Sequence, residues 1–130
     1  MLVLAIRTDK PEAELGLFAE HSKLAYETWQ AHRQLSVDIH RKIEALLQAQ
    51  GKTWQDVQGI VCFQGPGSFT GLRIGLGVGN AVAYSLGVPV VATMGEDWLA
   101  KGIARLHAGE QDEVALPHYG ANANITLPRK

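Results

Sequence analysis

The sequence predicts a single α/β domain, in which helices pack on a mixed β-sheet in the order β-β-β-α-β-α-β-α followed by a tail. In the first thirty residues apolar positions run in short continuous or alternating segments, and after residue 34 they recur at helical spacing. Strand-like and helix-like segments then alternate to about residue 106. A chain of 130 residues has room for one core of this kind. We therefore expect a lobe over residues 1–108 and an acidic link and tail over residues 109–130.

The first three segments predict strands joined by short turns. Residues 2–6 are continuously apolar, which suits a central strand that is covered on both faces. Residues 9–12 and 20–23 are rich in turn-forming side chains. Because connections this short join antiparallel neighbours, the first thirty residues predict a three-stranded antiparallel meander.

The rest of the chain alternates helices with short buried strands. The first helix is indicated by apolar residues at helical spacing from Leu35 to Leu47, and Gly51 is well placed to end it. Thr53 and Asp56 resemble a capping box for one brief helical turn. We expect a strand at 60–63, a long helix at about 70–86, a strand at 88–92 and a third helix at 96–106, while Ile125 and Leu127 hint at an added strand.

Composition excludes several classes of protein. Twelve Lys and Arg against thirteen Asp and Glu give a formal charge of -1, whereas a free-standing nucleic-acid binder needs a basic excess. The single cysteine, Cys62, excludes a disulfide framework and a CxxC metal site, which favours a reducing cytoplasm. The uncharged run 74–95 is long enough to cross a bilayer, but its five glycines and the Gly-Val-Pro at 87–89 predict a helix followed by a strand instead. We expect no membrane contact.

A glycine-rich loop, Gly-Pro-Gly-Ser-Phe-Thr-Gly-Leu-Arg-Ile-Gly at residues 65–75, leaves a buried strand and enters a helix. Free backbone N–H groups and the helix dipole can hold an anion at such a place. The candidate anion-binding residues are Gly65, Gly67, Ser68, Phe69 and Thr70. The loop has neither the Lys-Ser/Thr pair of a Walker loop nor GxGxxG spacing. A tight turn capped by Ser68 or Thr70 remains the alternative, and spacing alone favours it.

The helix after this loop carries small residues at every fourth position: Gly71, Gly75, Gly79, Ala83 and Gly87. Each interior glycine costs about 1 kcal/mol of helix stability relative to alanine. A soluble helix is expected to carry such a stripe where another backbone comes very close. That backbone could belong to a partner's helix, or to a helix or strand of this chain.

Signals for catalysis and metal binding are weak. The five histidines show neither HxxxH nor HExxH spacing, and Ser68 is not part of a GxSxG motif. We expect no catalytic residue and no metal site.

Residues 60–75 nevertheless resemble the signature of a known family, TsaB (YeaZ). The run Val-Pro-Val-Val at 88–91 follows at that family's distance, and residues 4–6 and His32 also fit. The resemblance implies the actin-like ATPase fold with a ribonuclease-H-like first lobe. It also implies a catalytically silent paralogue that pairs with TsaD, and in bacteria engages TsaE, in placing threonylcarbamoyl on the adenosine beside the anticodon of tRNA.

By this resemblance, pairing uses the first two long helices of both proteins as a four-helix bundle. The residues that we assign to this interface, with the division of the first helix's apolar residues between core and interface left open, are Leu35, Ile39, Ile43, Thr70, Gly71, Ile74, Gly75, Val78, Gly79, Val82 and Ala83. The chain itself is expected to carry no cofactor, because ATP and metal would sit on the TsaD-like partner, and to meet tRNA only through the complex. A homodimer in the absence of the partner is compatible with this resemblance.

Two departures from the family pattern matter. Arg7-Thr8-Asp9 stands where Asp-Thr-Ser is usual in TsaB, and the chain is too short for a second lobe, which residues 109–130 would replace.

From the glycine stripe and the resemblance together we predict an accessory subunit in which leucine at position 75 or 79 abolishes pairing and leaves the monomer folded. The alternatives are a nucleotide- or phosphate-binding lobe that uses residues 65–70, and a self-associating homodimeric scaffold.

Overall fold

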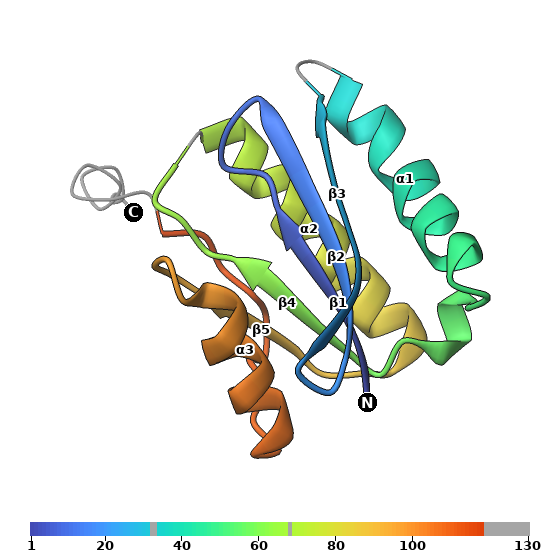
Figure 1. Ribbon diagram of the computed structural model, residues 1–130. Coiled ribbons are helices and arrows are strands. Elements are labelled where there is room, and N and C mark those ends of the chain that lie inside the picture. The colour runs from blue at the N-terminus through green and yellow to red at the C-terminus, as the bar shows by residue number, and fades with distance from the viewer. Residues whose placement is uncertain (32–33, 68, 119–130) are drawn as a thin grey trace.

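The computed structural model describes residues 1–31, 34–67 and 69–118 as a five-stranded sheet with helices on both faces (Figure 1). His32, Ser68 and the expected strand near residues 125–127 lie outside these ranges. The strands are β1 (Leu2–Arg7), β2 (Glu12–Ala19), β3 (Ser22–Gln30), β4 (Gly59–Phe63) and β5 (Val90–Thr93). The helices are α1 (Leu35–Ala49), the 3-10 turn η2 (Trp54–Asp56), α2 (Phe69–Leu86) and α3 (Trp98–His107).

The sheet has the strand order β3-β2-β1-β4-β5, with the meander on one side and two parallel strands on the other. β1 pairs antiparallel with β2 and parallel with β4, so Leu4 lies opposite both Leu17 and Ile60. Antiparallel strands can be joined by tight turns, whereas the parallel strands need the crossovers that α1 and α2 supply. The element order expected from the sequence is confirmed, with boundaries that differ by only a few residues.

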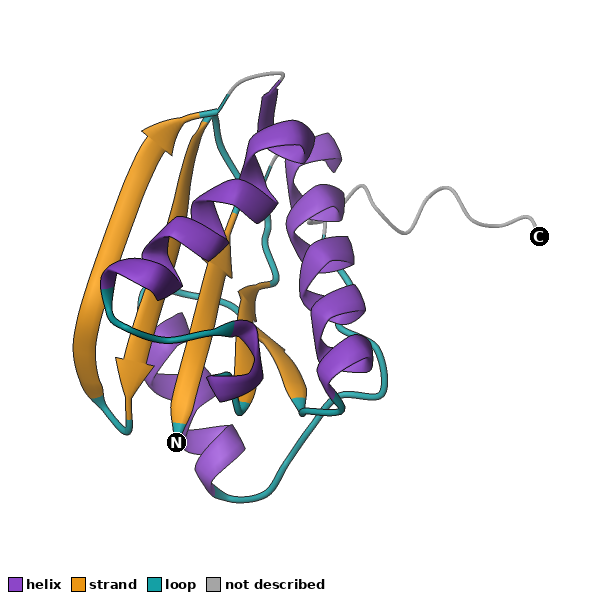
Figure 2. Ribbon diagram, turned by 90° about the vertical axis from the view of Figure 1, so that its right-hand side faces the viewer, coloured by secondary structure: helices purple, strands orange, loops and turns teal. Residues whose placement is uncertain are grey.

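Helices cover the two faces of the sheet unequally. α1 and α2 lie together on one face, and α3 lies on the other (Figure 2). α2 and α3 both pack closely on β4, from opposite sides. An added Cβ at Gly79 of α2 would overlap with Cys62, and one at Gly102 of α3 would overlap with Val61. Because Val61 and Cys62 are successive strand residues, their side chains point to opposite faces. A glycine thus brings each helix close to the same strand.

The core joins the inner faces of the helices to both faces of the central strands. The largest fully buried side chains include Leu4, Ile6, Leu15, Leu17, Ile39, Ile43, Leu47, Ile60 and Leu72. Each such side chain stabilises the fold by about 1.5–3 kcal/mol through burial. The apolar periodicity of α1 is therefore a core pattern.

Local signals at the ends of α1 and η2 have the expected form. α1 ends at Ala49, and Gly51 follows with a φ of +69°, a conformation that favours glycine. The backbone N–H of Thr53 donates to the Asp56 carboxylate at 2.8 Å, which confirms the capping box. Within the described ranges, none of the helices is both long and apolar enough to cross a bilayer.

Candidate functional site

The middle of the glycine stripe on α2 faces this chain's own sheet. An added Cβ at Gly75 would overlap with the Thr8 hydroxyl, and at Gly79 with the Cys62 sulfur. The Thr8 hydroxyl also donates to the Gly71 carbonyl at 2.7 Å, which fixes the first turn of α2 to the end of β1. The expectation that the stripe receives a partner's helix is therefore wrong at Gly75 and Gly79. Close helix–strand packing, the intramolecular alternative, explains both glycines.

Burial divides the other implied interface residues. Six of them are at most 9% exposed and form part of the core: Leu35, Ile39, Ile43, Val78, Val82 and Ala83. Val82 and Ala83 also line surface hollows, whereas Leu35, Ile39, Ile43 and Val78 serve the core, so the assignment of these four to an interface is wrong for the chain in this conformation. Thr70 is exposed, and Gly71 and Ile74 are half-buried, so these three positions remain accessible.

The opposite side of α2 carries a second set of mostly small residues, which we call the outer face: Thr70, Ile74, Gly77, Ala81 and Tyr84. These residues follow one another at intervals of four, three, four and three, the spacing of helices that pair side by side. An added Cβ at Gly77 would meet nothing within 4 Å, and Tyr84 is 92% exposed. A glycine within a helix costs about 1 kcal/mol, and no contact in the described ranges requires one at position 77.

A hollow of about 360 Å³ lies beside the outer face, between α2, α1 and η2. Its walls include His40, Trp54, Ala81 and Ser85. On α1, Val37 is 63% exposed. The side of the molecule built by α1 and α2 thus combines small exposed residues, exposed apolar side chains and a recess, which are features of surfaces that bind other proteins.

The sequence contained a signal for the outer face that a stripe of period four obscures. Glycines stand at positions 75, 77 and 79, and successive helical residues are about 100° apart. Positions 75 and 79 point in similar directions, whereas position 77 points almost the opposite way. At least one of these three glycines must therefore face away from the sheet.

The candidate anion-binding loop packs tightly on the turn between β1 and β2. An added Cβ at Gly67 would overlap with the Asp9 side chain, and Gly65, with a φ of +118°, lies against the main chain of His118. Ser68 is outside the described residues, and Phe69 begins α2. Much of the space beside this part of the loop is thus filled by the chain itself.

The turn between β1 and β2 carries an ion pair at the position where the sequence departs from the family. Arg7 donates to Asp9 through Nε at 2.8 Å and through one terminal nitrogen at 3.2 Å. Its guanidinium carbon lies 3.9 Å from the centre of the Phe63 ring. The hydrogen bond to Asp9 is the main cause that raises the pKa of Arg7, against the opposing effect of burial. Both charges are thus engaged inside the chain, beside the glycine loop.

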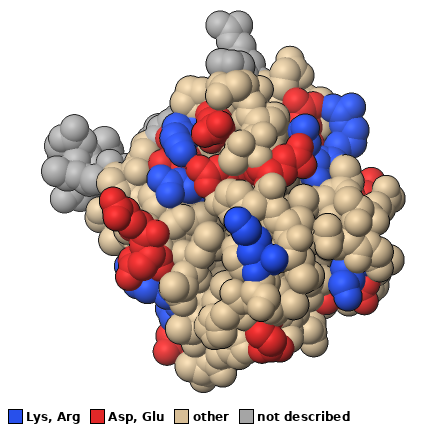
Figure 3. Space-filling view, in the orientation of Figure 1, with Lys and Arg blue, Asp and Glu red and all other residues tan. Residues whose placement is uncertain are grey.

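Within residues 1–31, 34–67 and 69–118, no three His, Cys, Asp or Glu side chains are grouped so as to hold a metal ion. Acidic and basic side chains are interspersed on the face seen in Figure 3.

Comparison with known proteins places this architecture. The family model described as "TsaD: tRNA N6-adenosine threonylcarbamoyltransferase" matches residues 29–117, more than half of the chain. The TsaB protein of Bacillus subtilis, named for tRNA threonylcarbamoyladenosine biosynthesis, is 32% identical over 77% of this chain and 44% of its own length. The structure of YeaZ from Pseudomonas aeruginosa matches with a TM-score of 0.65 and 30% identity, over 83% of this chain and 50% of that one.

A more distant neighbour shows the fold class. RuvC from Thermus thermophilus matches with a TM-score of 0.55 and 19% identity, over 95% of this chain and 87% of its own. The architecture is accordingly a ribonuclease-H-like lobe of the actin-like ATPase class, as the resemblance implied. The chain belongs to the TsaB (YeaZ) family, which the threonylcarbamoyltransferase model also recognises. It spans about half the length of the TsaB relatives that it matches.

Proposed function

We propose that this chain is a non-catalytic accessory subunit that pairs with a TsaD-like threonylcarbamoyltransferase in the modification of adenosine beside the tRNA anticodon. Membership of the TsaB family supports a role in this tRNA modification. The partner's class is supported by the transferase family model, which matches residues 29–117 and so spans α1, α2 and α3. Two proteins that share this lobe can present the same pair of helices to each other, in a pseudo-symmetric contact.

The observation that carries the proposal is the outward glycine at position 77. Helix axes normally pack 8–10 Å apart, and small residues at the contact permit the lower end of that range. The outer face offers such small positions at Gly77 and Ala81, flanked by Ile74 and Tyr84. Tyrosines are frequent among the residues that contribute most to binding energy, so Tyr84 is the anchor that we expect at the rim of the contact.

The partner would supply the ATP, the metal ion and the chemistry, and this chain would need no cofactor. The Arg7–Asp9 pair and the tight loop around Gly67 support this division of labour, because an incoming phosphate would have to separate an ion pair and meet a carboxylate. In the same proposal the chain acts in the cytoplasm, without membrane contact, and meets tRNA only through the assembled complex. TsaE would join that complex, and self-association of the chain in the absence of the TsaD-like subunit is compatible with this role.

Substitution at position 77 tests the pairing surface. The chain would be co-expressed with the TsaD of the same genome, and the complex measured by size-exclusion with mass determination. We expect Gly77→Leu to weaken pairing by at least about 30-fold, because its side chain fills the close contact, while the monomer remains at least as stable, since the position is open and the helix gains propensity. Ala104→Leu is the matched control, since it adds three of the same four side-chain carbons at an exposed position of α3 on the opposite face. A Gly77→Leu chain that binds the partner as tightly as the unmodified chain would refute the outer face as the contact.

The same preparations separate the alternatives. Calorimetry of the isolated chain with ATP and magnesium should give no binding heat, and micromolar affinity would instead support a nucleotide-binding lobe at residues 65–70. If the chain forms a stable homodimer that excludes the TsaD-like subunit, the self-associating scaffold is the better description.

A further inference from the structure

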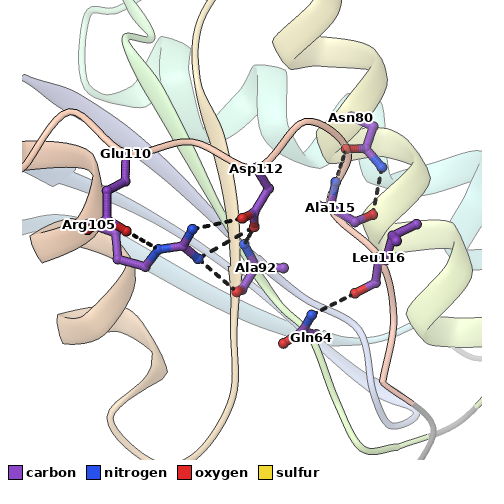
Figure 4. Close-up of polar contacts among 8 residues, drawn as sticks. All are labelled: Gln64, Asn80, Ala92, Arg105, Glu110, Asp112, Ala115 and Leu116. Atoms are coloured by element: carbon purple, nitrogen blue, oxygen red, sulfur yellow. Dashed lines mark hydrogen bonds and ion pairs between the residues drawn. The ribbon is translucent and has the colours of Figure 1, made fainter.

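Residues 110–118 pass the outer edge of β5, the last strand of the sheet, at Asp112 and then lie beside α2 and the loop after β4 (Figure 4). The Asp112 N–H donates to the Val90 carbonyl at 2.8 Å, and the Ala92 N–H donates to the Asp112 carboxylate at 2.8 Å. These β5 groups point away from β4, toward the side where a further strand would pair. Asp112 thus fills, with its own amide and its side chain, two positions that a neighbouring strand would occupy.

Arg105 of α3 holds this segment in place. Its guanidinium donates to the Asp112 carboxylate at 2.7 Å and to the Glu110 carboxylate at 2.9 Å. It also donates to the Ala92 carbonyl at 3.3 Å, a third group on the same edge. The hydrogen bond to Asp112 is the leading cause that raises the pKa of Arg105. We call the Arg105–Asp112 pair the latch.

Two further points fasten the segment beyond the latch. The side-chain amide of Asn80 on α2 pairs with both main-chain groups of Ala115, at 2.8 and 3.0 Å. The Gln64 side chain donates to the Leu116 carbonyl at 3.0 Å, and the Gln64 carbonyl accepts from the His118 N–H at 2.8 Å. The side chains that hold the segment therefore come from α2, from α3 and from the loop after β4.

The segment is held by polar contacts and buries little apolar surface. Ala115 is 2% exposed, whereas Val114 and Leu116 are 52% and 62% exposed. Hollows of about 650 and 690 Å³ lie on either side and share Asp112, Glu113 and Val114 as a wall. Each hydrogen bond contributes only a small net free energy, because water replaces it on opening. Opening this segment should therefore require less free energy than unfolding the sheet beneath it.

We propose that residues 110–118 form a strap that opens from β5 as one unit when the latch breaks, and that the uncovered edge binds an extended acidic peptide in its place. The freed edge would present the Ala92 N–H with the Val90 and Ala92 carbonyls, which is the template for adding a strand. Arg105 beside this edge would select a peptide with a carboxylate level with Ala92. Gly109, with a φ of +82° and open space at its Cβ position, is the hinge.

Hydrogen exchange of the unmodified chain tests the opening. We expect the amides of Ala92, Asp112, Ala115 and His118 to exchange as one group, faster than the β1 amides that pair with β4. Asp112→Ala should speed exchange at Ala92 and Ala115 by at least about tenfold and leave the β1 amides unchanged. Asp112→Asn, which keeps the shape but loses the charge, should have a smaller effect in the same direction. If these four amides exchange at the rate of the β1 amides, or respond separately to Asp112→Ala, the strap does not open as a unit.

A peptide added in trans tests the uncovered edge. The probe is a fluorescent peptide with the sequence of residues 109–118, mixed with the Asp112→Ala chain. We expect a rise in anisotropy together with slower exchange at the Ala92 amide, and binding at least about tenfold weaker for the same peptide with alanine in place of its aspartate. Arg105→Gln in the protein should remove that difference between the peptides. Failure of the peptide to slow Ala92 exchange at millimolar concentration would overturn the proposal for the edge.

Discussion

Two glycines on α2, only two residues apart, meet opposite surroundings. Gly79 lies against Cys62 of β4 so closely that no side chain fits, whereas Gly77 faces open space on the outer face. Both lower the intrinsic stability of the helix by about 1 kcal/mol relative to alanine. The inner glycine is explained by packing within the chain, while the outer one is explained by nothing in the described residues. Glycine content alone therefore cannot locate an interface, but the direction of each glycine can.

The largest expected effect that tests this contrast is a loss of stability at Gly79, on the side of α2 that faces the sheet. Gly79→Leu should lower the free energy of unfolding by about 3 kcal/mol or more, because the side chain must displace β4 or α2. This reverses the expectation from the sequence that leucine at this position leaves the monomer folded. Chemical denaturation followed by circular dichroism measures the change.

A double-mutant cycle supplies the control for this prediction. Gly79→Ala alone should destabilise by about 1–3 kcal/mol. Combined with Cys62→Ala, which removes the sulfur that the new methyl would meet, it should cost at least about 1 kcal/mol less than the sum of the single changes. Additive effects would mean that Cys62 does not set the limit at Gly79.

The second prediction concerns the stability of the chain at alkaline pH, which depends on the Cys62 thiol that Gly79 faces. Burial raises the pKa of the Cys62 thiol from 9.0 to about 12, so the folded chain keeps the proton that the unfolded chain releases. This contribution to stability is complete below pH 9 and is lost as the pH rises toward 12. The free energy of unfolding should fall by up to about 1.4 kcal/mol per pH unit in this window.

The control for the pH prediction is Cys62→Ala, which removes the thiol. Tyr26 also loses stabilisation at high pH, because burial and its hydrogen bond to Glu14 raise its pKa. The difference in slope between the unmodified chain and Cys62→Ala therefore isolates the thiol. Equal slopes would contradict the buried, protonated state of Cys62.

The smallest predicted effect is on the outer side and has the opposite sign. Gly77→Ala should raise the free energy of unfolding of the isolated chain by about 1 kcal/mol, because the methyl meets no neighbour and the helix gains propensity. Thermal unfolding of the monomer measures the gain. A loss of stability would show that position 77 is not open in the monomer and would remove the contrast with Gly79.

Much of the fold followed from local patterns in the sequence. The continuous apolar run of β1, the helical spacing from Leu35 to Leu47 and the Thr53–Asp56 cap each predicted the element that is found. These signals are reliable because burial on two faces, on one face of a helix, or at a helix end leaves a trace within a few residues. The parallel strands were predictable for the same reason, since each is a short apolar run next to a helix.

The surface was harder to predict because it depends on which way α2 is turned. A spacing of four residues advances about 400° around a helix, so the stripe from Gly71 to Gly87 rotates by about 160° along its length. It cannot remain on one face, and its middle part falls on the sheet. The buried residues of α1 were assigned to an interface for a related reason: apolar periodicity marks a buried face without saying what covers it.

The strap left no pattern in the sequence. Its fastenings join the side chains of Gln64, Asn80 and Arg105 to main-chain or acidic groups far along the chain. Such contacts have no period and no fixed spacing. The acidic run of Glu110, Asp112 and Glu113 was visible, but its pairing with α3 depends on the tertiary fold.

The close packing of α2 and α3 on β4 limits which residues can stand at positions 61 and 62. Gly79 and Gly102 are already the smallest residues available. Neither α2 nor α3 can therefore make room for a larger side chain on β4 by a substitution at these positions. Cys62 and Val61 can therefore be exchanged for smaller residues but not for larger ones unless a helix shifts. Mutational drift at this strand should run in one direction, and a library of substitutions at positions 61 and 62 selected for folding should return almost only side chains of equal or lesser volume.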